Sequence, residues 1–304
     1  MVDQVIIKRL ALTRYLYTIG IEQSQRPEPL SSASILTFHD SVELFLQLSC
    51  EIVGAGKSDI KFMEYWDLIN SKLTGVELTQ KESLRRLNTS RVNFKHHGTL
   101  PSKLDIEAFR ASVTNFFNEN TPTIFSLEFS SISLIEIVQS INVREKLKSA
   151  VAFLEEYKIE DALDSIALSF EIMVDEYELS KRTTYGRSPF FFGEPLTFHS
   201  SFFMGIGHNV NSSERKLGEF IDKVKDSIES LQKAVKLLSL GLDYKKYSKF
   251  KLFVPYVTRV ISGDYVIQRV NRGKSDLPTV DEVQFCIDFV IESSFKLQEF
   301  DFSL

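Results

Sequence analysis

The residues best suited to chemistry lie in one stretch, LNTSRVNFKHHGTLP, at positions 87–101. It contains Arg91 and two adjacent histidines, His96 and His97, of the five histidines in the chain. Imidazoles transfer protons near neutral pH, and a guanidinium can grip a phosphate through two hydrogen bonds. These residue types suit proton transfer at a phosphate ester. A helix end also explains them, because cations stabilise the last turn and Gly98 favours a left-handed stop.

The charge around this stretch is opposite in sign to the charge of the chain. From Lys81 to Arg110 the sequence has seven basic and three acidic residues, a local charge of +4, whereas the chain carries −5. The remaining residues therefore carry −9. A confined basic segment in an acidic protein is typical of a phosphate-binding or nucleic-acid-binding site.

Helical geometry limits which of these side chains can meet. Asn88, Arg91 and Lys95 are three and four residues apart and form one polar stripe, and Asn93 lies four residues before His97. Arg91 and His96 are five residues apart, which separates them by about 7.5 Å along a helix and about 140° around it. The two could reach one phosphate if the last turn unwinds or if two copies of the motif meet. A reactive site here therefore favours an oligomer.

The sequence Arg91-Val92-Asn93-Phe94-Lys95-His96 resembles the Arg-x(4–6)-His signature of HEPN domains (higher eukaryotes and prokaryotes nucleotide-binding). His97 fits the same signature with one more residue. The resemblance covers residues 1–120 and implies a helical bundle with the motif near the end of a later helix. It also implies a dimeric, metal-independent endoribonuclease of a toxin or anti-phage defence system, in which a ribose 2′-hydroxyl attacks the adjacent phosphate.

The resemblance implies specific roles and partners. The expected catalytic residues are Arg91, His96 and His97, and the expected substrate-binding residues are Asn88, Asn93, Lys95, Arg85 and Arg86. No cofactor and no metal are expected. The expected partners are RNA, with tRNA among the substrates to test, a second copy of the chain, and a partner or inhibitor protein. The alternative is a non-catalytic helical module that binds a protein or a nucleic acid.

Other signals for chemistry are weaker. GAGKS at 54–58 imitates a phosphate-binding loop, but Glu51 stands where that pattern needs its first glycine, and a helical pattern precedes it. The glycines are better explained as a helix stop. His39 and Glu43 are four residues apart, which allows a metal pair but favours a pair on the surface or at the edge of the core. No GxSxG motif supports a serine nucleophile.

A segment rich in phenylalanine, residues 184–210, has no helical period. It either packs onto the helices or forms a docking surface for a partner, since loops rarely expose so much aromatic surface. The residues expected to contact a partner are Phe190, Phe191 and Phe192, and Phe198, Phe202 and Phe203 add to the same surface.

Composition sets the class of protein. Of 304 residues, 43% are hydrophobic and 25% charged, which is ordinary for a globular protein, and Gly and Pro are few. No apolar run is long enough to span a membrane, and charges throughout the first twenty residues do not match a signal peptide. Cys50 and Cys286 form no framework spacing. We therefore expect a cytoplasmic protein.

Hydrophobic periodicity predicts an all-α protein of two domains, at 1–120 and 121–304. The boundary is placed at NENTPTIFSLEFSS, the least helical part of the first half. Helices are expected to about residue 23, from Ser31 or Ser32, over 60–73, from Thr79 to His97, and over 103–120. In the second domain, which contains the phenylalanine-rich loop, long helices are expected over 144–182, from Ser212 or Ser213 to Gly241, and after Pro278.

Overall fold

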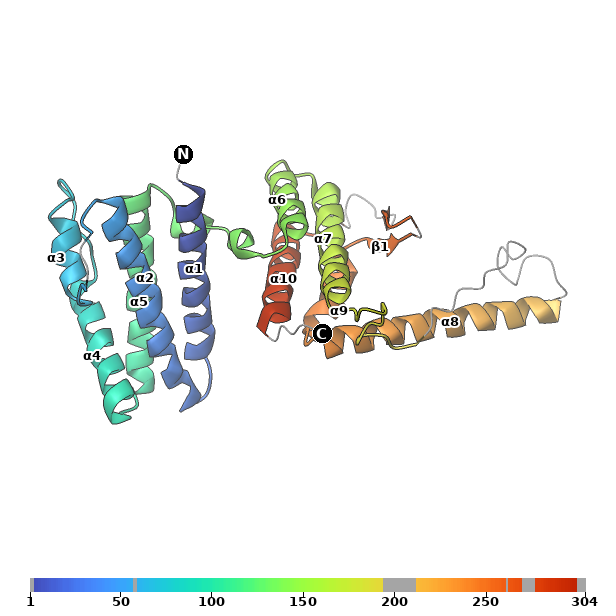
Figure 1. Cartoon of the computed structure of the whole chain (residues 1–304), viewed down its shortest axis with the longest axis horizontal. Helices are drawn as coiled ribbons and strands as arrows, with labels where there is room; N and C mark the ends of the chain where they lie inside the picture. Colours follow the sequence, from blue (N-terminus) through green and yellow to red (C-terminus); the bar gives the residue numbers. More distant parts are fainter. Residues whose placement is uncertain (1–2, 57–58, 194–211, 261, 270–276, 300–304) are drawn as a thin grey trace. The chain divides into compact units, whose positions relative to one another are not determined.

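The computed structural model describes residues 3–56, 59–193, 212–260, 262–269 and 277–299, with side chains between 212 and 239 described from residue 219 onward. Over these residues the chain is all-α, as predicted, apart from one two-stranded antiparallel sheet. The chain divides into two compact units, Met1–Ile137 and Val138–Leu304. Figure 1 colours the first from blue to green and the second from green to red.

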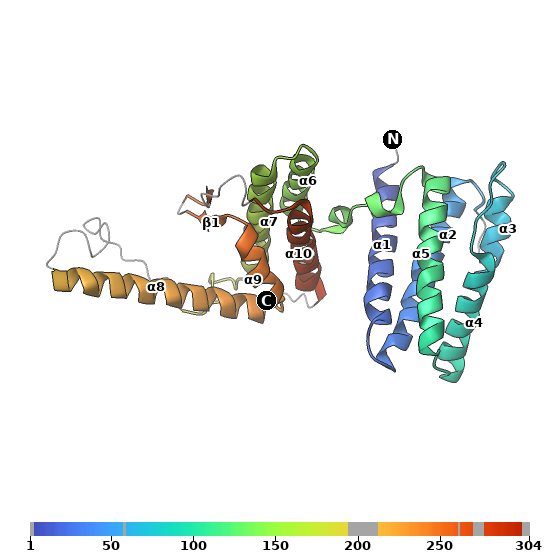
Figure 2. The same cartoon turned by 180° about the vertical axis from the view of Figure 1, so that it is seen from behind.

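The first unit is a bundle in which α1, α2, α4 and α5 run side by side, as both Figure 1 and Figure 2 show. Its elements are α1 (Gln4–Ser24), the 3-10 helix η1 (Leu30–Ala33), α2 (Ser34–Ile52), α3 (Glu64–Asn70), α4 (Lys81–His97), α5 (Lys103–Phe125), η2 (Phe129–Ser131) and η3 (Leu134–Ile137). Helix α2 packs against α1, α3, α4 and α5, so it is the central helix of the bundle.

The core of this unit is largely aromatic. The Phe45 ring of α2 packs edge-on against Phe116, Phe117 and Phe125 of α5, with ring centroids 5.2, 5.5 and 5.4 Å apart. Such pairs add to the hydrophobic stabilisation of the buried rings. Cys50 is buried in the same core, as expected for a cysteine on an apolar helix face. Helix α2 ends before Gly54, whose φ is 69°, so this glycine acts as the predicted helix stop.

The predicted domain boundary at residue 120 falls inside α5, and the structure divides the chain after Ile137 instead. Helix α5 continues through Pro122 to Phe125. Proline weakens a helix interior because it lacks an N–H group, so the sequence around Pro122 has a weak helical pattern. The side chain of Phe125 is only 5% exposed and packs on Phe45, and this burial accompanies the continued last turn.

The second unit combines helices with the small sheet. Its elements are α6 (Ile141–Glu155), α7 (Ile159–Ser180), α8 (Ser212–Ser239), α9 (Tyr244–Phe253), β1 (Tyr256–Arg259), β2 (Tyr265–Gln268) and α10 (Val280–Glu299). The strands pair with Val257 opposite Ile267 and Thr258 opposite Val266. Helix α9 and the two strands, which are ten and four residues long, were not expected from the sequence.

Aromatic rings and ion pairs hold this unit together around α7. Phe170 of α7 stacks on Tyr247 of α9 and on Phe289 of α10, with ring centroids 5.5 and 5.6 Å apart. At the end of β2, Arg269 donates hydrogen bonds to two aspartates of α7, at 2.7 Å from Asp161 Oδ1 and 2.6 Å from Asp164 Oδ2. The sheet is thereby joined to α7 by charge-assisted hydrogen bonds.

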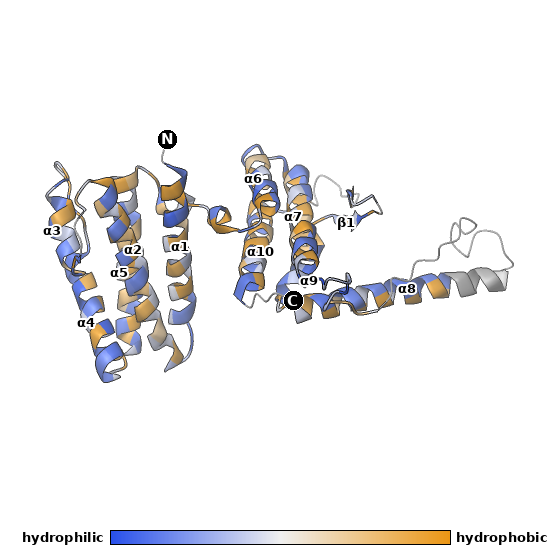
Figure 3. Ribbon diagram, in the orientation of Figure 1, coloured by the Kyte–Doolittle hydropathy of each residue, from blue (hydrophilic) through white to orange (hydrophobic). Residues whose placement is uncertain are grey.

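Helix α8 exposes a hydrophobic stripe that we call the α8 seam (Figure 3). Its residues recur at alternating intervals of three and four and are 37–64% exposed: Ile221, Val224, Ile228, Leu231, Val235 and Leu238. On another face, Lys233 and Lys236 form ion pairs of 2.6 Å with Glu171 and Glu178 of α7. Like the other helices in the described ranges, α8 has no apolar segment long enough to cross a membrane.

The phenylalanine-rich loop is described only to residue 193. Phe190 is 9% exposed and lies 6.0 Å from the Tyr177 ring of α7, whereas Phe191 and Phe192 are 56% and 37% exposed. The first of the three predicted docking residues therefore packs onto the helices, and the other two face outward. The remaining phenylalanines of the predicted surface, at 198, 202 and 203, lie outside the described residues.

Candidate functional site

The stretch with the paired histidines forms the end of α4, and the stop has the predicted geometry. Gly98 adopts a left-handed φ of 65°. Its N–H donates to the Phe94 carbonyl at 3.1 Å, and the N–H of Thr99 donates to the Asn93 carbonyl at 3.3 Å. These bonds satisfy carbonyls that a helix end leaves free. Lys95, His96 and His97 occupy the last turn, where their charge complements the dipole.

Helix α5 begins only a few residues later, at a capping box. The Asp105 N–H donates to Ser102 Oγ at 3.2 Å, and the Ser102 N–H donates to Asp105 Oδ2 at 3.3 Å. The hydroxyl of Ser102 also donates to Asp105 Oδ2 at 2.6 Å. Reciprocal bonds of this kind fix where a helix starts. The turn between α4 and α5 is therefore bounded by defined caps on both sides.

One face of α4 points inward, toward α2. Leu84 and Leu87 are fully buried, and Asn88 Oδ1 lies 3.0 Å from Nε2 of His39 on α2. One turn further on, the Nε atom of Arg91 is buried and has no hydrogen-bond partner in the described part of the chain. Two members of the predicted stripe, Asn88 and Arg91, thus belong to the contact between α4 and α2.

His39 is the residue in this contact that sequence reasoning underrated. It is 3% exposed and stacks on Phe62, with ring centroids 4.2 Å apart. Burial lowers the pKa of His39 below its ordinary value, and the positive charge of Arg91 lowers it further, whereas Glu43, the hydrogen bond to Asn88, and Asp40 raise it. The only signal in the sequence was a histidine on the apolar side of a helix, four residues before a carboxylate.

The opposite face of α4, which we call the α4 outward face, borders a groove with α5. The groove has about 830 Å³ of empty space, part of it open to solvent. Its lining from α4 consists of two arginines and three neutral polar residues: Arg85, Arg86, Thr89, Ser90 and Asn93. Phe109 and Asp105 of α5 complete it, together with the turn residues Thr99 to Pro101. Three predicted substrate-binding residues, Arg85, Arg86 and Asn93, are therefore brought together.

The two histidines are exposed and lie on the same side of α4 as the arginines. By helical geometry His96 is about 20° around the axis from Arg85, and His97 about 20° from Arg86, although each pair is about 16 Å apart along it. Neither histidine lines the groove. Arg91 is about 140° from His96, so within one chain the predicted pair does not converge on one phosphate. Lys95 is exposed, and by helical geometry it lies on the side of α4 that carries Asn88 and Arg91.

The cations of this face differ in how far they are paired. Arg85 forms an ion pair of 3.1 Å with Glu82, but both side chains are more than half exposed, so the pair is weak. Arg86 of this face has no ion pair within the described ranges, and neither has Lys95 on the Asn88 side of the helix. Their charge is available to an anion.

Comparisons of the chain with models of protein families, with curated proteins and with solved structures found no match. The fold and the site define an all-α protein with two units, the first of which carries a basic helix face beside an open groove. The chemistry of its own residues is the basis for assigning a function.

Proposed function

We propose that the first unit binds RNA through the phosphate backbone, along the α4 outward face. The observation that carries the proposal is the position of Arg85 and Arg86 beside Asn93 in an open groove, within a segment of charge +4 in an acidic chain. Contacts between cations and phosphates supply most of the affinity in sequence-independent binding. Phe109 is 4% exposed and cannot stack on a base, so the groove suits the backbone more than the bases.

RNA cleavage is a second candidate, favoured by the exposure of His96 and His97 on the same side of the helix. One neutral imidazole would take the proton of the ribose 2′-hydroxyl as its oxygen forms a bond to phosphorus. The bond from phosphorus to the 5′-oxygen then breaks, and an imidazolium gives that oxygen a proton. The products are a 2′,3′-cyclic phosphate and a 5′-hydroxyl, and the reaction needs no metal. Lys95, next to His96 in the chain, would hold the charge of the reacting phosphate, and the two arginines, about 16 Å away along the helix, would hold other phosphates of the strand.

The resemblance to HEPN domains supports an RNA-directed role and a toxin or defence setting. It also gives Arg91 a catalytic part, which a single chain does not support because Arg91 lies about 140° around α4 from His96 and its Nε atom is buried. In our proposal Arg91 is a positioning residue that keeps α4 against α2. The groups that contact RNA are those of the α4 outward face.

We further propose that two copies of the chain associate through the α8 seam. The interval of three and four residues is that of a coiled coil, and in the sequence it extends back to Leu217. One set of positions is β-branched (Ile221, Ile228 and Val235), and Leu231 and Leu238 belong to the other set. This combination favours two parallel strands.

The residues beside the seam fit a second copy as partner. In a parallel pair, Ser227 would face Gln232 and Ala234 would face Ser239 of the other copy, so no like charges meet. A membrane surface is a poorer occupant, because the polar side of α8 mixes acidic and basic residues instead of being basic. A different protein bound to the seam, or to Phe191 and Phe192, would instead make the chain a non-catalytic module or the target of an inhibitor.

Binding and cleavage can be tested together. The wild-type chain is incubated with total RNA and with tRNA in EDTA, beside His96→Gln/His97→Gln and Arg85→Gln/Arg86→Gln variants. We expect the arginine variant to lose binding, and the histidine variant to bind but not to cleave. A matched control is Lys8→Gln/Lys72→Gln, which removes the same charge from exposed sites elsewhere in the first unit.

The outcomes separate the two candidates. Cyclic phosphate ends made only by chains with both histidines support cleavage. If the wild-type chain binds RNA and no chain cleaves it, RNA recognition is retained as the function and the enzyme candidate is rejected. Equal RNA affinity of the arginine variant and the wild type would reject the binding proposal itself.

A further inference from the structure

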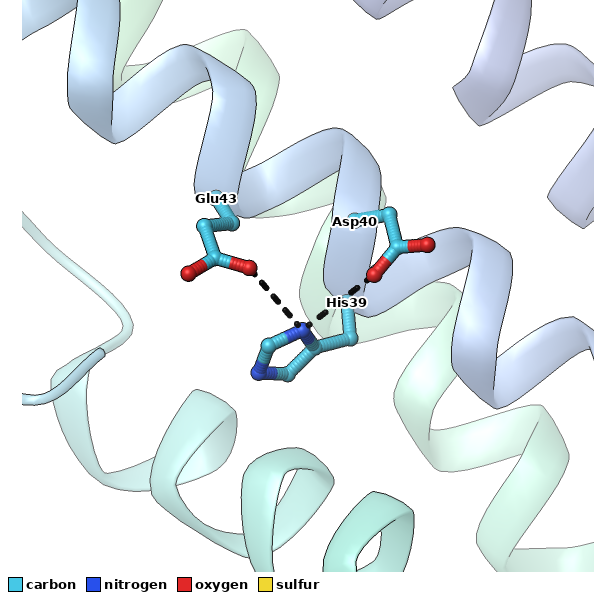
Figure 4. A group of neighbouring side chains, drawn as sticks. All are labelled: His39, Asp40 and Glu43. Atoms are coloured by element: carbon cyan, nitrogen blue, oxygen red, sulfur yellow. Dashed lines mark ion pairs between the residues drawn. The ribbon is translucent and has the colours of Figure 1, made fainter. Parts of the chain in front are cut away.

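Three atoms that donate electron pairs to metals lie together at the edge of the first bundle, on one turn of α2. Figure 4 shows Nδ1 of His39 facing the carboxylates of Asp40 and Glu43. Nδ1 lies 3.7 Å from Asp40 Oδ1 and 3.7 Å from Glu43 Oε2. The three ligand atoms all lie within 4.8 Å of one another. No described group donates a hydrogen bond to Nδ1, although His39 is 3% exposed.

The opposite nitrogen of the ring determines what Nδ1 can be. Nε2 lies 3.0 Å from Asn88 Oδ1, which is an acceptor, so the proton of the neutral ring belongs on Nε2. Nδ1 is then an unprotonated nitrogen whose lone pair is directed at two carboxylate oxygens. Three electron-rich atoms facing one another repel, and a cation between them would convert the repulsion into coordination.

The arrangement also has the outer support typical of a bound histidine. A histidine that binds a metal almost always donates its other N–H to an oxygen acceptor, which fixes the tautomer and the ring orientation. Asn88 supplies that acceptor from α4, and Phe62 stacks on the ring. The imidazole is thus held on both sides before any ion arrives.

The distances suit an ion with short bonds. For bonds of about 2.1 Å, tetrahedral ligands are about 3.4 Å apart, so the two distances of 3.7 Å from Nδ1 need a shift of about 0.3 Å. The two carboxylate oxygens lie within 4.8 Å of each other and need to approach by at most about 1.4 Å. Asp40 and Glu43 are 58% and 33% exposed, and both can move that far. One nitrogen and two oxygens match the ligand preference of Zn²⁺ among abundant ions. The open side leaves room for water.

The charges around the site remain favourable to a cation. Asp40 and Glu43 carry two negative charges, and Arg91 is the positive group that acts on His39 from α4. Arg91 offsets part of the negative charge, so the affinity should be moderate. A site of this kind would tie α2 to α4 through Asn88 and take no part in the cleavage proposed above.

We propose that His39, Asp40 and Glu43 bind one divalent transition-metal ion, with Zn²⁺ as the best fit. The test uses the full chain stripped with EDTA and titrated with Zn²⁺, followed by calorimetry and native mass spectrometry. We expect one ion per chain, a rise in the unfolding temperature with Zn²⁺, and its loss on adding EDTA. Co²⁺ in place of Zn²⁺ should give a visible absorption spectrum.

Variants assign the site. Asp40→Asn/Glu43→Gln should abolish binding, and Asn88→Ala should weaken it by about 10- to 100-fold, as removal of an outer-shell partner does. Glu22→Gln, an exposed carboxylate of α1, is the matched control and should bind normally. His96→Gln/His97→Gln should also bind normally, which separates the site from the histidine pair of α4.

Several results would overturn the proposal. One is the absence of Zn²⁺ binding by the stripped chain, and another is binding that survives the double carboxylate change. Loss of binding in the His96→Gln/His97→Gln chain would assign the ion to α4. Nitrogen NMR gives a readout independent of folding: a proton on Nδ1 of His39 in the metal-free chain at neutral pH would contradict the tautomer on which the site depends.

Discussion

The salt dependence of the proposed RNA binding is the most direct test of which face of α4 would meet the phosphates. Each cation that neutralises a phosphate of a single strand contributes about 0.7 to the slope of log affinity against log salt. Arg85 and Arg86 are the two arginines of the groove. Changing both to Gln should therefore lower the magnitude of the slope by about 1.4.

The same relation gives the expected loss of affinity. If the electrostatic contribution vanishes near 1 M salt, two lost contacts weaken binding by about 65-fold at 0.05 M salt and by about 10-fold at 0.2 M. These are upper values, because Arg85 already has a weak ion pair with Glu82. Arg86 alone should account for about half of the change in slope.

Fluorescence anisotropy with a labelled 2′-O-methyl RNA of about 16 nucleotides measures the slope without cleavage, because the attacking hydroxyl is blocked. Arg91→Gln is the informative comparison. Its Nε is buried and its charge acts on His39 of α2, so the slope should stay that of the wild type, whatever the change costs in stability. An unchanged slope in the Arg85/Arg86 chain, or an equal loss in the Arg91 chain, would refute the reasoning.

Three further predictions concern packing and association. Gly20→Ala would place a Cβ 2.6 Å from a carbon of the fully buried Phe38 ring. The overpacking should cost about 1–3 kcal/mol and outweigh the gain of about 1 kcal/mol in helix propensity. Urea unfolding should therefore show a less stable chain. A more stable chain would contradict this packing. Arg269→Lys removes the planar guanidinium that donates to two aspartates of α7. It should destabilise the second unit by about 0.5–1 kcal/mol in thermal unfolding. An unchanged midpoint temperature would mean that these ion pairs contribute nothing to stability. Ile228→Asp should convert a dimer into a monomer in sedimentation, whereas Ser230→Asp, outside the α8 seam, should not; a wild-type monomer would remove the seam as an interface.

The helices were predictable because their hydrophobic residues recur over many turns. The stop at Gly98 was predictable from one glycine with cations before it. The end of α5 was not predictable, because Pro122 disfavours a helix locally. The contact that accompanies the last turn is between Phe125 and Phe45, which are far apart in sequence. The hairpin was missed because strands of four residues carry little periodic signal.

The candidate site divides in the same way. The position of the basic segment could be read from charge, and the angle between Arg91 and His96 from helical geometry. Which face of α4 is buried depends on its contact with α2, and the bond between Asn88 and His39 joins residues 49 positions apart. No local pattern shows such a pair, so the sequence could not show that the Nε atom of Arg91 is buried or that its charge acts on His39.

The caps on both sides of the turn between α4 and α5 have a consequence for the entropy of binding. Gly98 and the Ser102–Asp105 capping box leave the backbone of the groove's rim already ordered. A ligand there would immobilise side chains but not a loop, and each arginine side chain has about 2 kcal/mol of rotamer entropy to lose. The groove therefore combines an ordered backbone with two long side chains that can change rotamer, Arg85 and Arg86. In the proposed RNA complex, the entropic cost of binding would therefore fall on these two side chains and not on the backbone of the turn.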